Sequence, residues 1–310
     1  MLLDKLLIIG STGLVGSKVA SLAANYGFEA YNTQHSRKSP LPNSVELDIT
    51  DREATVGLIE KIRPRVIINT AAVTNVDFCE THNDVAQSVN VDGVKNLAEG
   101  ARGTQSRVIQ VSTDYVFDGR VGHYEEDDTP HPLQCYGKTK FEAEKIVSDL
   151  PSFVIARPSV IYGWTPVHPT AEAGSSKPMN FGVFVLDKLR RHETVKVVRD
   201  QYASPTFADN LGEALLKLAR ARENGIFHTA GRSCLSRYEF AIKLAEIFGY
   251  SVGQVEPVYS SELKQLAERP RNSCLRVEKA GKLLGISLLN AEQGIKEMKR
   301  QEPLQPDPSL

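Results

Sequence analysis

Short apolar runs alternate with segments of helical periodicity along the first half of the chain. The run KLLIIG ends at Gly10, as a strand buried on both faces requires. Helical spacing from Leu14 to Tyr26 and then the strand-like segment FEAYNTQ follow it. The alternation continues through a helix that starts at Thr50 or Asp51 and ends before Pro64, RVIINTAA, a helix from Asp84 to Arg102, RVIQVST, a helix from Leu133 to Leu150, and SFVIARPS. Repeated units of this kind predict an α/β fold with a doubly wound parallel (Rossmann-type) sheet.

A second, smaller lobe of mixed α/β structure is expected from Trp164 onward, where periodicity gives way to a stretch rich in Pro, Gly, Ser and His. We predict a dinucleotide-binding domain over residues 1–163, to which residues 209–231 return. Residues 164–208 and 232–300 form the predicted substrate-binding lobe, and the polar residues 301–310 a flexible tail. Within the smaller lobe the pattern predicts the strand VKVVRD and helices at 181–191, 236–248, 260–268 and 277–284.

Composition and charge exclude some classes of function. Lys and Arg number 37 against 38 Asp and Glu, a formal net charge of -1, so no global field attracts nucleic acid or an anionic membrane. The apolar run within residues 1–10 is too short for a signal peptide or a membrane span. The seven histidines show no ligand spacing, and the acidic run 125–128 is interpreted as a solvated loop, so we expect no catalytic metal.

The cysteines favour a reducing compartment. They lie far apart in the sequence and form no CxxC pair, so they predict neither a zinc site nor a disulfide framework. The four positions are Cys79, Cys135, Cys234 and Cys274. We therefore expect a cytoplasmic protein.

Three glycines, Gly10, Gly13 and Gly16, stand at the junction of the first strand and the first helix. Bare backbone at this point lets a pyrophosphate approach the N–H groups of the helix N-terminus, whereas the alternative interpretation is a tight turn without a ligand. The strand before the motif and the helix after it favour a dinucleotide site. The residues expected to form it are Gly10, Ser11, Thr12, Gly13, Leu14, Val15 and Gly16.

The end of the second strand bears on the choice of cofactor. An acidic residue there would bind the ribose 2'-hydroxyl of NAD, but the chain has Gln34, His35, Ser36, Arg37 and Lys38. Arg37 and Lys38 favour the 2'-phosphate of NADP(H), with NAD still open, unless they belong to a solvated basic loop.

Asp48 and Ile49 follow the next short apolar run. The Asp48 carboxylate is expected either to accept from the adenine amine or to cap the following helix.

Tyr136 and Lys140 lie four residues apart, so a helix places both on one face. Between them and the glycine motif, a predicted strand ends at Ser112 and Thr113, at the sheet edge where parallel sheets bind ligands. Thr113 is expected to hold a carbonyl oxygen while Tyr136 donates a proton to it. Lys140 and an oxidised nicotinamide would together lower the pKa of the phenol. The alternative is a surface tyrosine beside a solvated lysine.

Several motifs resemble the extended short-chain dehydrogenases/reductases: GSTGLVG, STDYVFDG, YGKTK and RPSVIYG. DQYASPT, RYEFA and RPRNSCL extend the resemblance to the dTDP-4-dehydrorhamnose reductases over nearly the whole chain. The resemblance implies a catalytic set of Thr113, Tyr136 and Lys140. It implies a cofactor site that includes Ser112, Tyr136 and Lys140 as well as Asn69, Ala71 and Ala72. The substrate site that it implies consists of Thr74, Thr113, Asp114, Val160 and Arg269.

One position departs from the resemblance. These reductases carry a tryptophan that packs on the sugar where this chain has Val160. Trp164 either substitutes for it or anchors the junction of the lobes. Arg269 and Arg271 either clamp a nucleotide pyrophosphate or are surface arginines.

The leading hypothesis is NADPH-dependent reduction of the 4-keto group of a nucleotide-activated deoxysugar. A second is a non-catalytic, NADP-binding role like that of the regulatory subunit of methionine adenosyltransferase, since fold alone does not decide function. An epimerase also stays open. A dehydratase would need a second carboxylate after Asp114, where Tyr115 stands. The expected partner is a small nucleotide sugar, and a homodimer is left open.

Overall fold

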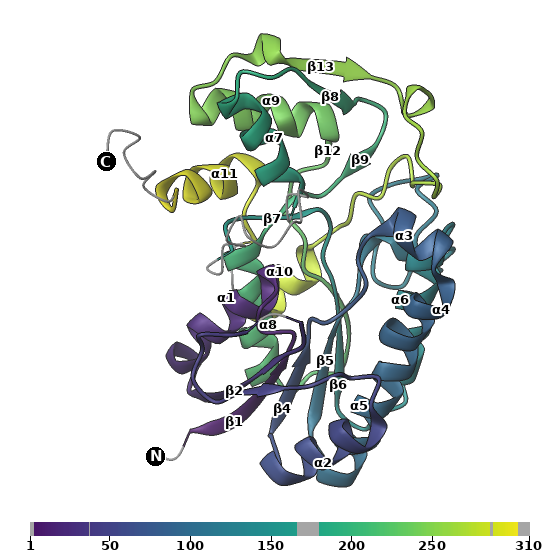
Figure 1. The fold of residues 1–310 in the computed structure, drawn as a ribbon, viewed down its shortest axis with the longest axis vertical. Helices are drawn as coiled ribbons and strands as arrows, with labels where there is room; N and C mark the ends of the chain where they lie inside the picture. Colours follow the sequence, from purple (N-terminus) through teal and green to yellow (C-terminus); the bar gives the residue numbers. More distant parts are fainter. Residues whose placement is uncertain (1–2, 37, 166–179, 286–287, 303–310) are drawn as a thin grey trace.

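The computed structural model describes residues 3–36, 38–165, 180–285 and 288–302. Its centre is a seven-stranded sheet in the order β11-β6-β5-β4-β1-β2-β3 (Figure 1). All neighbouring pairs are parallel, which confirms the predicted Rossmann-type sheet. The strands are β1 (Asp4–Ile9), β2 (Phe28–Gln34), β3 (Ser44–Glu46), β4 (Val66–Asn69), β5 (Arg107–Val111), β6 (Phe153–Arg157) and β11 (Gly225–His228).

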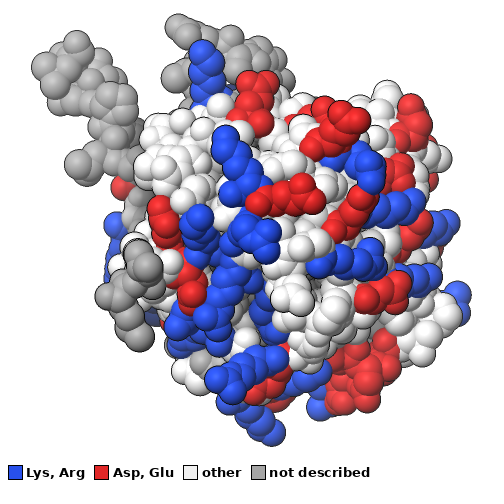
Figure 2. Space-filling view, turned by 90° about the horizontal axis from the view of Figure 1, so that it is seen from below, with Lys and Arg blue, Asp and Glu red and all other residues white. Residues whose placement is uncertain are grey.

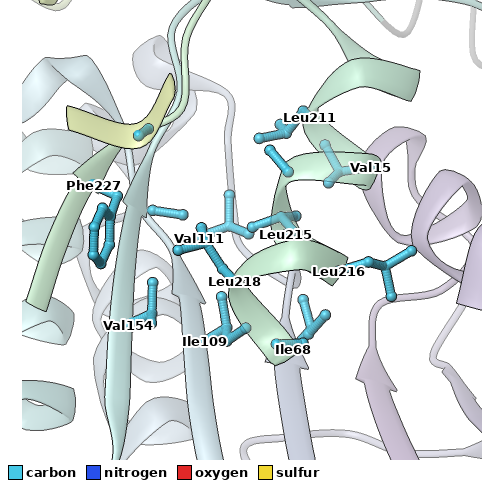
Figure 3. Packing of buried hydrophobic residues seen from close by; sticks show 14 of the residues in the cluster. Val15, Ile68, Ile109, Val111, Val154, Leu211, Leu215, Leu216, Leu218 and Phe227 are labelled. Carbon is cyan, nitrogen blue, oxygen red and sulfur yellow. The ribbon is translucent and has the colours of Figure 1, made fainter. Parts of the chain in front are cut away.

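Helices cover both faces of the sheet (Figure 1). One face packs against α1 (Leu14–Leu22), α8 (Ala208–Arg220) and α10 (Glu278–Leu284), and Figure 3 shows α8 leucines on strand residues such as Ile68, Ile109 and Val154. The other face packs against α2 (Arg52–Ile62), α5 (Gly93–Thr104) and α6 (Cys135–Ser148). Because strands covered on both faces must be apolar throughout, these two cores explain the unbroken apolar runs.

A third core lies beyond the carboxyl ends of the strands (Figure 1). It is built by α7 (Phe181–Arg190), α9 (Arg237–Phe248) and α11 (Ala291–Arg300), beside the parallel pair β8 (Val195–Val198) and β13 (Val255–Val258). Two small pairs complete it: β7 (Ile161–Tyr162) with β10 (Thr206–Phe207), and β9 (Tyr202–Ala203) with β12 (Leu235–Ser236).

Four differences from the predicted elements stand out. The helix expected over 260–268 is wrong beyond the single turn Ser260–Glu262, whereas α11 and β13 were not predicted. The segment 277–284, expected in the smaller lobe, packs as α10 on β11 and α8. The helix expected over 84–102 is divided into α4 (Asn83–Gln87), a π-helical turn (Ser88–Asp92) and α5, and is preceded by α3 (Val76–Thr81). The tail prediction falls almost wholly outside the described residues, which end at 302.

The cysteine prediction is wrong at one pair. Cys234 and Cys274 form a disulfide between segments 40 residues apart, while Cys79 and Cys135 are free. The pair was missed because disulfide partners are neighbours in space, which the spacing of cysteines in the sequence does not report. The cysteines therefore no longer argue for a reducing compartment.

Surface charge is mixed. Figure 2 shows Lys and Arg gathered over part of the face that lies below in Figure 1, with Asp and Glu among and beside them. In the described part of the chain, no helix is both long and apolar enough to cross a membrane. Across the same residues, no three His, Cys, Asp or Glu side chains gather as a metal site would require.

Candidate active site

The turn between β1 and α1 presents backbone rather than side chains to its surroundings. Gly10 has a left-handed φ of 79°, and Gly13 N donates to Gly10 O at 3.0 Å. A Cβ on Gly16 would lie 2.3 Å from Gly10 O, so α1 packs directly on the turn. Gly13 is the N-cap of α1 and has no side chain to bind the first N–H groups of the helix. The geometry fits an anionic pyrophosphate at this helix N-terminus.

Two cavities meet over this turn. The first, of about 760 Å³, is lined by residues that include Gly10, Thr12, Gly13, Asp48, Ile49, Thr70, Ala71 and Ala72. The second, of about 700 Å³, is lined by residues that include Gly13, Leu14, Val15, Thr70, Ala72, Thr74, Ser112, Thr113, Asp114, Tyr136, Lys140 and Val160. Because Gly13, Thr70 and Ala72 line both, one groove runs from the end of β2 to Tyr136.

Three of the predicted cofactor residues support this groove from behind. Gly16 permits the close packing of α1, and Ser11 Oγ donates to Thr33 O at 2.8 Å. Asn69 Oδ1 accepts from Ala71 N at 3.1 Å and so fixes the backbone of a residue that lines the groove. None of the three is among the residues that line the two cavities, and their part in cofactor binding stays a prediction.

Of the two basic residues predicted to select NADP, the structure describes only Lys38. Gln34, His35 and Ser36 line the first cavity, but the exposed Lys38 does not. Arg37 lies outside the described residues. Recognition of the 2'-phosphate by this pair stays a prediction.

Asp48 lines the same cavity and is not a helix cap. Its Oδ1 accepts from the backbone N and the hydroxyl of Thr50, at 2.9 and 2.7 Å, and these hydrogen bonds hold the pKa of the carboxyl below its usual value. The N-cap of α2 is Asp51, whose side chain accepts from Ala54 N. The capping alternative for Asp48 is therefore wrong, and adenine binding stays a prediction.

Tyr136 and Lys140 lie in the first two turns of α6, on the face that closes the second cavity. Gln134 caps this helix by accepting from Gly137 N at 3.2 Å. Tyr136 is 9% exposed and Lys140 is 3% exposed, so the alternative of a surface tyrosine and a solvated lysine is wrong. Lys140 Nζ donates to Val111 O, the last carbonyl of β5, at 2.6 Å. That contact anchors the ammonium at the carboxyl edge of the sheet.

Burial sets the protonation of this pair. It raises the pKa of Tyr136, and the nearby Thr113 hydroxyl only partly opposes the rise. Burial also lowers the pKa of Lys140 to about 8, against the effect of the Glu144 carboxylate. The lowered phenol pKa expected from the sequence requires an oxidised nicotinamide beside Lys140, so it stays a prediction. In the protein alone, burial keeps Tyr136 a neutral proton donor, and most of the Lys140 side chains are charged at neutral pH.

Asp114, expected beside the sugar, lines the second cavity but has both oxygens occupied. Its Oδ1 accepts from Thr113 Oγ1 at 3.1 Å, and its Oδ2 accepts from Ser159 Oγ at 2.7 Å and Ser273 Oγ at 2.5 Å. Burial raises the pKa of this carboxyl, and the hydroxyl donors oppose the rise. Asp114 therefore orients Thr113 and joins it to the segment that carries Ser273.

The remaining predicted substrate residues lie in different places. Val160 lines the catalytic cavity with a φ of 43°, which is strained for a β-branched residue. Arg269 does not line that cavity, and its Nη1 donates to Asp77 Oδ1 at 2.5 Å. Trp164 is buried, and its Nε1 donates to Met298 O at 2.8 Å, so it is an anchor and not a replacement sugar platform.

Comparison with known proteins places the chain in a family. The family model described as the RmlD substrate binding domain matches residues 4–302. The chain belongs to the RmlD family. This family includes the dTDP-4-dehydrorhamnose reductases among the extended short-chain dehydrogenases/reductases, as the sequence motifs implied.

Individual RmlD-like relatives match along nearly the full length. The dTDP-4-dehydrorhamnose reductase of Aggregatibacter actinomycetemcomitans is 35% identical, over 95% of this chain and 98% of that protein. The structure of the dTDP-4-dehydrorhamnose reductase of Bacillus anthracis in complex with NADP has a TM-score of 0.84 at 27% identity, over 96% of this chain and 99% of that one. Methionine adenosyltransferase 2 subunit beta of Bos taurus is 32% identical, over 89% of this chain and 82% of that protein.

Sequence reasoning missed a group that this RmlD-family chain holds behind the catalytic pair. Glu144 and Arg157 form a buried ion pair with Nη2 and Oε2 2.7 Å apart. Glu144 follows Lys140 at the same four-residue spacing that links Lys140 to Tyr136, so the periodicity held a signal for Glu144. Arg157 comes from a distant strand, and no pattern in the sequence pairs it with α6.

Proposed function

We propose that this protein uses NADPH to reduce the 4-keto group of a nucleotide-activated deoxysugar. The observation that carries the proposal is the single groove in which Thr113, Tyr136 and Lys140 meet the glycine turn through Gly13. A bound NADPH would supply the hydride for the carbonyl carbon. The fit of a pyrophosphate at Gly13, and the NADP in the Bacillus anthracis relative, support this cofactor.

The residues of the chain supply the rest of the chemistry. As the carbonyl oxygen gains negative charge, Tyr136 Oη donates its proton to it, since burial keeps the phenol protonated. The Lys140 ammonium then stabilises the phenolate that is left. The Thr113 hydroxyl donates to Asp114 in the protein alone. We propose that it turns this one proton from Asp114 to the substrate oxygen and so positions that oxygen beside the phenol.

A third cavity, of about 740 Å³, is our proposed site for the nucleotide part of the substrate. Arg199 and Arg271 line it together with Tyr202 and Tyr259, which are 38% and 53% exposed. Arginines suit a diphosphate and exposed aromatic rings suit a base. Arg269 lines this cavity as well, but its ion pair with Asp77 favours a structural role over the predicted pyrophosphate clamp.

The direct test mixes purified protein, NADPH and a dTDP-4-keto-6-deoxyhexose and follows the absorbance of the reduced cofactor. We expect one NADPH to be consumed for each sugar reduced, and consumption to be about 100- to 10,000-fold slower with Tyr136→Phe. No oxidation with any nucleotide ketosugar would remove the proposal. An epimerase would convert the sugar without net consumption of NADPH, so the same assay distinguishes it.

A regulatory role is the second candidate, favoured by the 32% identity to methionine adenosyltransferase 2 subunit beta. Such a role needs the fold and the cofactor groove but not proton transfer from Tyr136. It predicts co-elution with an adenosyltransferase catalytic subunit on gel filtration and the same co-elution for Tyr136→Phe. The enclosed Thr113, Tyr136 and Lys140 support the reductase instead.

A further inference from the structure

A buried ion pair lies directly behind the catalytic pair. Glu144, on α6, is 2% exposed, and Arg157, on β6, is 1% exposed. Arg157 Nε donates to Glu144 Oε1 at 2.9 Å and Nη2 donates to Oε2 at 2.7 Å. Removing two charged groups from water costs more than burying apolar side chains of the same volume, so packing alone does not explain this pair.

The same carboxylate reaches the segment that follows β5 and carries Thr113. Ser112 Oγ donates to Glu144 Oε1 at 2.5 Å, and Ser112 immediately precedes Thr113. One carboxylate therefore ties together α6, which bears Tyr136 and Lys140, the end of β5, and β6. It is placed to fix the distances among the three catalytic groups.

Three charged side chains surround the position of Lys140. Glu144 follows it by four residues on the same helix and favours its charged form. Asp114 lines the same cavity, and Arg157 is paired with Glu144. Behind Arg157 lie Glu126 and His228, and burial lowers the pKa of His228 to about 3, so this imidazole is uncharged at neutral pH. Without Glu144, Lys140 would share a dry interior with the cation of Arg157.

We propose that Glu144 is a positioning residue, held by Arg157 and Ser112 so that its carboxylate keeps the Lys140 ammonium charged beside Tyr136. The catalytic meaning of this arrangement rests on the proposed function. The electrostatic claim concerns the protein alone and is tested without substrate.

Two variants that change opposite charges give opposite predictions. Glu144→Gln keeps the shape but removes the negative charge, so the titration midpoint of Lys140 moves to lower pH, by about 1 pH unit or more. Arg157→Met removes the positive charge and leaves the carboxylate to Lys140, so the midpoint moves to higher pH. The measurement is the NMR titration of the lysine Nζ in selectively labelled protein without cofactor, with Lys140→Arg used to assign the signal.

The directions of the two shifts distinguish an electrostatic effect on Lys140 from a general disturbance of the fold. Shifts in opposite directions support the proposal, whereas two unchanged midpoints, or two shifts in the same direction, overturn it. If one variant does not fold, the direction of the other decides. Glu144→Asp keeps the charge and is expected to retain a midpoint close to that of the wild type.

The pH profile of ketosugar reduction then tests the catalytic meaning. Glu144→Gln is expected to move the alkaline limb of the rate to lower pH, and Glu144→Asp to restore it. An alkaline limb that stays in place while the Lys140 titration shifts would overturn the catalytic part. A wild-type protein that reduces no ketosugar would refute the proposed function, while the titration would still decide the electrostatic claim.

Discussion

Replacing Gly16 by alanine perturbs the cofactor groove without touching any group that takes part in chemistry. The added Cβ would lie 2.3 Å from Gly10 O and 2.8 Å from Thr70 Oγ1. The first contact is with backbone, so no side chain can rotate away to relieve it. The turn or the helix must therefore move by about 0.7 Å to restore a 3.0 Å contact.

A shift of that size is large compared with the tolerance of a hydrogen bond. N–H···O distances cluster between about 2.7 and 3.2 Å, so a displaced first turn of α1 loses good geometry to a bound pyrophosphate. Overpacking of this kind lowers the free energy of unfolding by about 1–3 kcal/mol. The loss of affinity comes from the hydrogen bonds to the pyrophosphate, because a hydrogen bond to a charged group contributes about 1.5–3 kcal/mol. Since about 1.4 kcal/mol is a tenfold change in affinity, we expect Gly16→Ala to weaken NADPH binding by about tenfold or more.

The matched control is Gly57→Ala. Gly57 is also a helical glycine, in α2, but an added Cβ there meets nothing within 4 Å. Alanine is favoured over glycine in a helix by about 1 kcal/mol, so this variant is expected to gain stability and to bind NADPH as the wild type does. Calorimetric titration with NADPH and thermal unfolding measure both effects. Wild-type affinity and stability in Gly16→Ala would refute the reasoning.

Three further predictions follow from the site. Tyr136→Phe is expected to lower the reduction rate by about 100- to 10,000-fold with NADPH affinity unchanged, and steady-state kinetics with a binding titration check this. Because burial lowers the pKa of Lys140 to about 8, reduction is expected to slow as the pH rises through that value, and a rate that stays constant there would contradict this prediction. The free energy of unfolding should rise between about pH 8 and 10.5, because only the unfolded chain keeps the Lys140 proton in that range. The disulfide closes a loop of 40 residues, so the double variant Cys234→Ser, Cys274→Ser should lower the free energy of unfolding, measured in urea, by up to about 4 kcal/mol. A wild-type protein that is equally stable with and without reductant would contradict this prediction.

The parallel sheet and the glycine turn were predictable because each depends on local sequence. An apolar run such as Leu6–Ile9 must be buried on both faces, and Gly10, Gly13 and Gly16 mark the strand–helix junction. Tyr136 and Lys140 were predictable for the same reason, because helical spacing alone puts them on one face.

Contacts between distant segments could not be read in this way. Nothing near Ser273 in the sequence indicates that its hydroxyl donates to Asp114, and Arg269 looks like a ligand-binding arginine until Asp77 is found beside it. The raised pKa of the phenol in the protein alone was also beyond sequence reasoning, because it depends on how completely the fold encloses Tyr136.

Transfer of deuterium tests the central claim most directly. The protein is incubated with a dTDP-4-keto-6-deoxyhexose and NADPH that carries deuterium at the transferable position, and the sugar product is analysed by mass spectrometry and NMR. The account predicts one deuterium at C4 of the reduced sugar, and labelled product that forms about 100- to 10,000-fold more slowly with Tyr136→Phe. A product without the label, or no product with any nucleotide ketosugar, would contradict it.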